Sequence, residues 1–165
     1  MDCEIGRFVY RINPGNSSRY GELNMFAKIV ILGFALLEFS NVLALYFFPA
    51  SRRANAVGVF SAWEKSRQYP EIHDFVQYLV YWVAGAKLIF IFLLVGIAIF
   101  GDANLQRVSL IALALATLSF YWRLFPLIRK MDQNGQITPR NYSKTLGMMI
   151  FSLIILFLIA ALISF

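Results

Sequence analysis

Two charged side chains lie inside long apolar segments of this sequence, where charge is not expected. Glu38 is near the middle of an apolar stretch at about residues 25–48, and Lys87 is near the middle of a second stretch at about residues 75–100. An isolated charge at the centre of a bilayer costs about 2.5 to 3.5 kcal/mol on insertion scales. Because a carboxylate and an ammonium group at one depth neutralise each other, we predict that the two residues form an ion pair.

An amide accompanies the predicted pair. Asn41 follows Glu38 by three residues, which places both side chains on nearly the same face of a helix. The amide is therefore expected to complete the hydrogen bonding of the pair. Two roles follow from such a cluster. It either fixes the register of two helices, or it provides a protonatable or cation-binding Glu38 whose charge Lys87 balances until a proton or substrate competes.

Four apolar segments must position these residues. The chain has 165 residues, of which 59% are hydrophobic, and a mean hydropathy of +0.65, which is more apolar than a soluble domain. Each segment is near the ~20 residues with which a helix crosses a bilayer. The segments lie at about residues 25–48, 75–100, 105–128 and 146–165. We predict an all-α integral membrane protein, a single domain over residues 1–165, with four transmembrane helices in an antiparallel bundle.

The loops carry weaker signals. In the first loop, about residues 52–72, apolar and charged residues alternate as is typical of a short amphipathic helix at the membrane interface, with Val57, Phe60 and Trp63 towards the lipid. Pro70 predicts the first turn of the second long helix. In the third loop, Thr138 and Pro139 predict the N-cap and the first residue of the fourth helix.

Basic residues are concentrated in two of the loops. The first and third loops carry more lysine and arginine than the tail, second loop and C-terminus together, which places those two loops in the cytoplasm and both termini outside. The membrane is then a plasma or inner membrane. The formal net charge of +6 fits anionic lipid headgroups, and no nucleic-acid partner is expected, because the basic residues flank spans instead of forming one face.

Cofactor ligands are scarce in this chain. Cys3 is the one cysteine and His73 the one histidine, which excludes an intrachain disulfide, a dithiol redox pair and a haem held by two histidines of one protomer. We expect no cofactor and no metal. His73 and Asp74, with Glu64 upstream, form a possible interfacial site for a lipid headgroup or a proton, although acidic residues are also expected at a solvated helix start.

Three functional hypotheses remain. The leading one is a small membrane transport or channel protomer that acts as a homo-oligomer, with Glu38, Asn41 and Lys87 lining the ligand or ion pathway. The alternative is a non-catalytic accessory or assembly subunit that packs against partner membrane subunits. The third is a membrane enzyme acting on lipid or quinone at the cytoplasmic interface through Glu64, His73 and Asp74. The first two, which are not enzymes, are favoured.

Overall fold

The chain is helical throughout the part that the structure describes. The computed structural model describes residues 14–52 and 57–164, and side chains from residue 25 onward, so Cys3, Arg7, Arg11 and Arg53 lie outside it. Within these ranges the elements are helices, and the single β contact is an isolated bridge. In chain order they are α1 (Pro14–Phe47), the 3-10 helix η1 (Val57–Val59), α2 (Ser61–Ser66), α3 (Pro70–Phe100), α4 (Ala103–Leu118), α5 (Phe120–Gln133) and α6 (Tyr142–Ile163).

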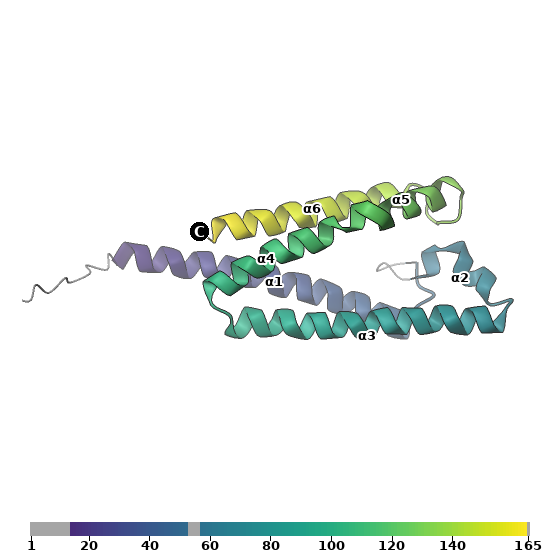
Figure 1. Cartoon of the computed structure of the whole chain (residues 1–165), viewed down its shortest axis with the longest axis horizontal. Coiled ribbons are helices and arrows are strands. Elements are labelled where there is room, and N and C mark those ends of the chain that lie inside the picture. The colour runs from purple at the N-terminus through teal and green to yellow at the C-terminus, as the bar shows by residue number, and fades with distance from the viewer. Residues whose placement is uncertain (1–13, 53–56, 165) are drawn as a thin grey trace, which may run out of the picture.

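Four helical segments are long and apolar enough to cross a membrane: α1 from Met25, α3, α4 together with α5, and α6. Consecutive segments run in alternating directions (Figure 1). Large apolar side chains are exposed along all four, a surface that suits lipid and not water. These features indicate an integral, multi-pass membrane protein.

Exposed serines on these helices satisfy their hydroxyl groups without solvent. Each of three serine hydroxyls donates a hydrogen bond to a backbone carbonyl three or four residues earlier. The distances are 2.7 Å for Ser40, 2.7 Å for Ser109 and 3.0 Å for Ser152. Such bonds let a polar side chain lie on a helix surface where no water is present. These three serines are therefore compatible with a surface that faces lipid.

The two ends of the molecule differ. The α3–α4 turn and the C-terminus lie at one end, here called the terminal end, together with the N-terminal part of α1 (Figure 1). The described parts of the first loop, residues 48–52 and 57–69, and the third loop, residues 134–141, lie at the other, here called the loop end. At the loop end, Ser61 N–H donates to the Gln136 carbonyl and Thr138 N–H donates to the Val59 carbonyl, both at 2.9 Å. The two loops are thus joined through their backbones.

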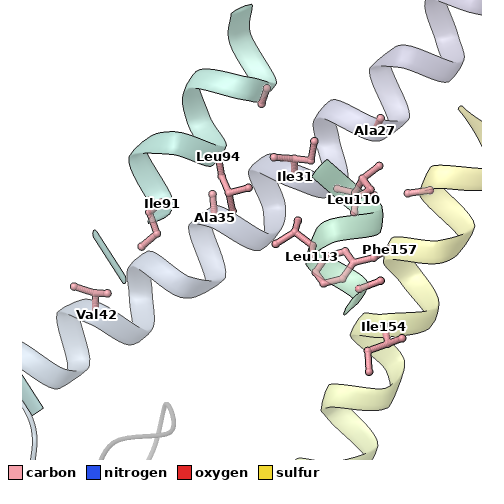
Figure 2. Close-up of a cluster of buried hydrophobic side chains, with 14 of the residues drawn as sticks. Ala27, Ile31, Ala35, Val42, Ile91, Leu94, Leu110, Leu113, Ile154 and Phe157 are labelled. Atoms are coloured by element: carbon pink, nitrogen blue, oxygen red, sulfur yellow. The ribbon is translucent and has the colours of Figure 1, made fainter. Parts of the chain in front are cut away.

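The helices form two hairpins with a large buried cluster along their length and a smaller one at the loop end, where Val59 packs with Ile128, Ile137 and Leu146. α1 packs chiefly against α3, and α4 chiefly against α6. Figure 2 shows Ile31 of α1 near Leu110 and Leu113 of α4 and Phe157 of α6, whereas Val42 lies farther along α1 from this contact. Ile31, Leu110 and Phe157 are completely buried. The hairpins therefore pack closely in their terminal half.

The first loop differs from its sequence-based prediction. It contains a short helix, α2, but Trp63 is 3% exposed and packs against His73, with ring centroids 4.8 Å apart. The expectation that Trp63 faces the lipid is therefore wrong. The physical reason is that α2 folds back onto the first turns of α3, which begins at Pro70 as predicted, so the indole is buried within the protein.

The third and fourth spans also differ locally from their predictions. The third is two helices with a break at Ser119, whose hydroxyl donates to the Ala116 carbonyl at 2.6 Å. The fourth helix begins at Tyr142 and not after Thr138. Asp132 explains this later start, because its carboxylate accepts hydrogen bonds from the backbone N–H groups of Asn141 and Ser143 and supplies the cap from a different helix.

We predict that Gly58→Ala weakens the attachment of the first loop. A Cβ atom at this position would lie 2.0 Å from the backbone carbonyl oxygen of Ala50, which cannot move away as a flexible side chain can. The free energy of unfolding in detergent is expected to fall by about 1 to 3 kcal/mol. The matched control is Gly96→Ala, where a Cβ meets nothing within 4 Å. Equal stability of the two variants would contradict the close approach.

Candidate functional site

The two charges inside the apolar helices meet in the structure. The Lys87 ammonium donates a 2.7 Å hydrogen bond to Oε2 of Glu38 and a 2.9 Å hydrogen bond to Oδ1 of Asn41. Glu38 and Asn41 come from α1 and Lys87 from α3, so the cluster lies within the first hairpin. The ion pair and the amide contact expected from the sequence are both present. Whether these residues form a ligand or ion pathway stays a prediction.

The cluster of Glu38, Asn41 and Lys87 is partly buried. The side chain of Glu38 is 18% exposed and that of Lys87 is 29% exposed, whereas Asn41 is buried. Partial burial strengthens the attraction between the two charges, because fewer water molecules screen them. Partial exposure leaves the carboxylate within reach of a proton or a small ligand. The Glu38 carboxylate can therefore exchange Lys87 for another partner, and the ion pair can also hold the two helices together.

Phe34 borders the cluster on its terminal side. It precedes Glu38 by one helical turn, and its ring packs edge-on against two others. The ring centroids lie 6.3 Å from that of Phe90 on α3 and 5.0 Å from that of Phe157 on α6. Phe34 therefore joins both hairpins directly beside the carboxylate, and beyond it lies the closely packed core.

Two grooves reach the cluster from the loop side. The first has a volume of about 350 Å³, and its lining includes Glu38, Thr117, Ser119 and Arg123 of α5. The second, about 300 Å³, contains Asn41 and Arg52 and runs between α1 and the start of α6. We call them the Arg123 groove and the Arg52 groove. Each joins one acceptor of Lys87 to an arginine nearer the loop end.

A third opening lies between α3 and α4. It has a volume of about 430 Å³, includes both Glu38 and Lys87, and is otherwise lined almost entirely by apolar side chains such as Trp82 and Phe90. Trp82 is 64% exposed, so this lateral groove faces the surroundings of the protein at the depth of the ion pair. A charged pair therefore borders a surface that would contact lipid or another membrane helix.

The three residues of the predicted interfacial site are engaged separately. Glu64 pairs with Arg67 at 3.5 Å, and both side chains are largely exposed. His73 shares a 2.8 Å hydrogen bond with the hydroxyl of Ser66 through Nδ1. Asp74 is exposed on the first turns of α3. No hydrogen bond or ion pair among the described residues joins Glu64, His73 and Asp74 to one another.

Sequence reasoning missed the residues that border the cluster. Phe34 is one aromatic residue within an apolar run, and nothing in the sequence distinguishes it from its neighbours. Arg52 and Arg123 are among the basic residues that flank the spans, and their connection to Asn41 and Glu38 depends on how the two hairpins pack. The polar wall residues Thr117 and Ser119 carried the one available signal, since hydroxyl groups in a span often line a contact or a cavity.

Comparisons with known proteins give no relative for this site: no family model, no curated protein and no solved structure matches the chain.

We predict strong energetic coupling between Glu38 and Lys87. Lys87→Met leaves a carboxylate without its counter-charge and should lower the free energy of unfolding in lipid–detergent micelles by about 2 to 4 kcal/mol. The double variant Glu38→Gln/Lys87→Met should recover most of that loss, because no uncompensated charge remains. The matched control is the exposed pair Glu64→Gln/Arg67→Met, whose coupling should stay below about 1 kcal/mol. Additive losses at Glu38 and Lys87 would show that the pair carries no coupling.

Proposed function

We propose that the protein is a membrane transport protomer in which Glu38 takes up and releases a proton. One observation carries the proposal: the Glu38, Asn41 and Lys87 cluster lies where the closely packed terminal half meets the grooved loop half. A site that is reachable from one side and blocked on the other is what transport by alternating access requires. Release on the opposite side requires a second conformation in which the packing around Phe34 opens.

The charges around the grooves favour a proton over a metal cation. Arg52 and Arg123 border the two approaches, and their positive charge disfavours the entry of cations. Protonation of Glu38 removes the counter-charge of Lys87, and the ammonium group can then bind a small anion from the groove. The proposed cycle therefore couples the uptake of a proton on Glu38 to the binding of an anion at Lys87. Deprotonation restores the ion pair and releases the anion.

We further propose that the loop end lies in the cytoplasm of a cell whose plasma or inner membrane holds the bundle. Both loops with the higher density of basic residues lie at this end, and the positive-inside rule assigns such loops to the cytoplasmic side. In this orientation the grooves open the site to the cytoplasm, and both termini lie outside.

An oligomer fits the lateral groove. Four spans are few for a complete transport path, and this groove leaves Glu38 and Lys87 beside an apolar opening at the surface. A second copy of the chain covering it would remove the charged pair from contact with lipid and would enclose the site. The protein is thus proposed to act as a homo-oligomer.

The lateral groove also favours a second candidate function, an accessory subunit. A helix of a different membrane protein that covers the groove would equally shield Glu38 and Lys87, and the pair would then serve to hold α1 and α3 in register. This candidate differs from the first in two measurable ways. The purified chain would not form a defined homo-oligomer, and it would carry no flux.

We predict that liposomes containing the protein dissipate an imposed pH gradient and that Glu38→Gln slows this flux at least about tenfold, because the amide cannot take up a proton. A pH-sensitive dye trapped inside the liposomes reports the proton flux, which is measured once in chloride buffer and once in buffer with the impermeant anion gluconate. Mass photometry gives the oligomeric state of the protein. Glu64→Gln is the matched control, since it removes an exposed carboxylate at the loop end. Wild-type flux no faster than that of empty liposomes would overturn the transport proposal, and a monomer in that experiment would favour the accessory subunit.

We predict one-sided access along the Arg123 groove. In a Cys3→Ser background, Thr117→Cys should react with a membrane-impermeant thiol reagent applied from the loop side, because Thr117 lines the groove. Leu110→Cys is the matched control on the same helix, and it should stay unreactive because Leu110 is completely buried in the terminal half. The orientation of the protein in the membrane is determined from the labelling of Glu64→Cys on α2, at the loop end. Labelling of Thr117→Cys only from the terminal side would contradict the proposed direction of access.

A further inference from the structure

A basic hollow lies at the loop end, apart from the Glu38 cluster. It has a volume of about 840 Å³ and is bordered by α5, the third loop and the start of α6. Each of these segments contributes one cation: Arg129 from α5, Arg140 from the loop and Lys144 from α6. The hollow shares no lining residue with either groove that reaches the cluster.

The positive charge of this hollow is not balanced by the residues that line it. Asp132 is the one carboxylate in its lining, and that carboxylate accepts hydrogen bonds from the Ser143 hydroxyl at 2.6 Å and from the backbone N–H groups of Ser143 and Asn141. Within the described part of the chain, no ion pair joins any of the three cations to a carboxylate. Two positive charges are therefore left without a counter-charge in one concave site.

The hollow is held in shape by its own backbone. Gly135 and Asn141 adopt left-handed backbone conformations, with φ of 68° and 65°, and the Asp132 hydrogen bonds tie the end of α5 to the start of α6. The third loop is also joined to the first through the Thr138 to Val59 hydrogen bond. A ligand entering this site would not have to order the loop, which reduces the entropic cost of binding.

We propose that this hollow binds the phosphate headgroup of an anionic lipid that carries two negative charges. Arginine presents several N–H donors in a planar fork that matches phosphate oxygens, and lysine adds a compact charge. Basic pockets between membrane helices on the cytoplasmic side are a recurrent way of holding such headgroups. A doubly charged headgroup would balance the two positive charges left by Arg129, Arg140 and Lys144 against Asp132.

The surroundings favour a lipid over free phosphate. Phe125, one helical turn before Arg129, supplies an apolar wall to the hollow. Farther into the membrane, Trp122 on α5 is 77% exposed, and Met148 on α6, one turn after Lys144, is 65% exposed. The charged site thus continues into an exposed apolar strip on both helices. Acyl chains can pack along that strip, whereas inorganic phosphate has no use for it.

The test is native mass spectrometry of the detergent-purified protein with defined lipids. The wild type should retain phosphatidic acid or cardiolipin at least about tenfold better than phosphatidylcholine. The triple variant Arg129→Gln/Arg140→Gln/Lys144→Gln should lose this preference. The matched control is Lys65→Gln/Arg67→Gln/Lys130→Gln, which removes three cations that lie outside the hollow, and it should keep the preference.

Further arms separate the possible outcomes. Arg140→Gln alone, on an exposed turn, tests the site without altering a helix and should weaken retention of the doubly charged lipid severalfold. An equal loss of the lipid preference in the control triple variant would overturn the proposal, because binding would then depend on the overall surface charge and not on the hollow. Displacement of the lipid by inorganic phosphate or glycerol phosphate at similar concentration would overturn the lipid assignment, because binding would then need no acyl chain.

Discussion

A charge in the hydrocarbon interior needs a counter-charge at its own depth, and this requirement organises the first hairpin. The Lys87 ammonium reaches Glu38 and Asn41 together, so one cation satisfies two acceptors on the neighbouring helix. Because a helix rises about 1.5 Å per residue, a slip of one turn would move the partners about 5 Å apart. The contact between Lys87 and its two acceptors is therefore possible in this register of α1 against α3 and not in a register one turn away.

The second hairpin is packed unequally against the first. In the terminal half, Ile31, Leu110 and Phe157 are completely buried, and Phe34 connects α1 to both α3 and α6. In the loop half, grooves run between the hairpins and the third span is broken at Ser119, and the hairpins meet again at the loop end, where Val59 packs with Ile128, Ile137 and Leu146. The polar cluster stands at the boundary between these halves. The packing around the charged residues is therefore closer on the terminal side than on the side of the grooves.

Much of this architecture could be predicted from sequence, because apolar length and the depth of a charge are local or nearly local properties. The four spans and the contact between Glu38 and Lys87 follow from them. The docking of the first loop on the third could not be predicted, since backbone hydrogen bonds between distant segments depend on no particular side chain. Trp63 was misjudged because an indole that packs on protein and one that faces lipid look alike in a sequence. The grooves could not be predicted from the sequence either, because they are volume that the packing of the side chains leaves unfilled.

The chain distance between the paired charges has a consequence for synthesis. Glu38 and Lys87 are 49 residues apart, and a ribosome adding about 5 to 20 residues per second makes the lysine roughly 2 to 10 s after the glutamate. During that interval the first span has no counter-charge from its own chain. An ionised Glu38 gains its counter-charge only when the second span arrives. The hairpin, and not the single helix, is therefore the smallest unit in which an ionised Glu38 can enter the bilayer together with its partner.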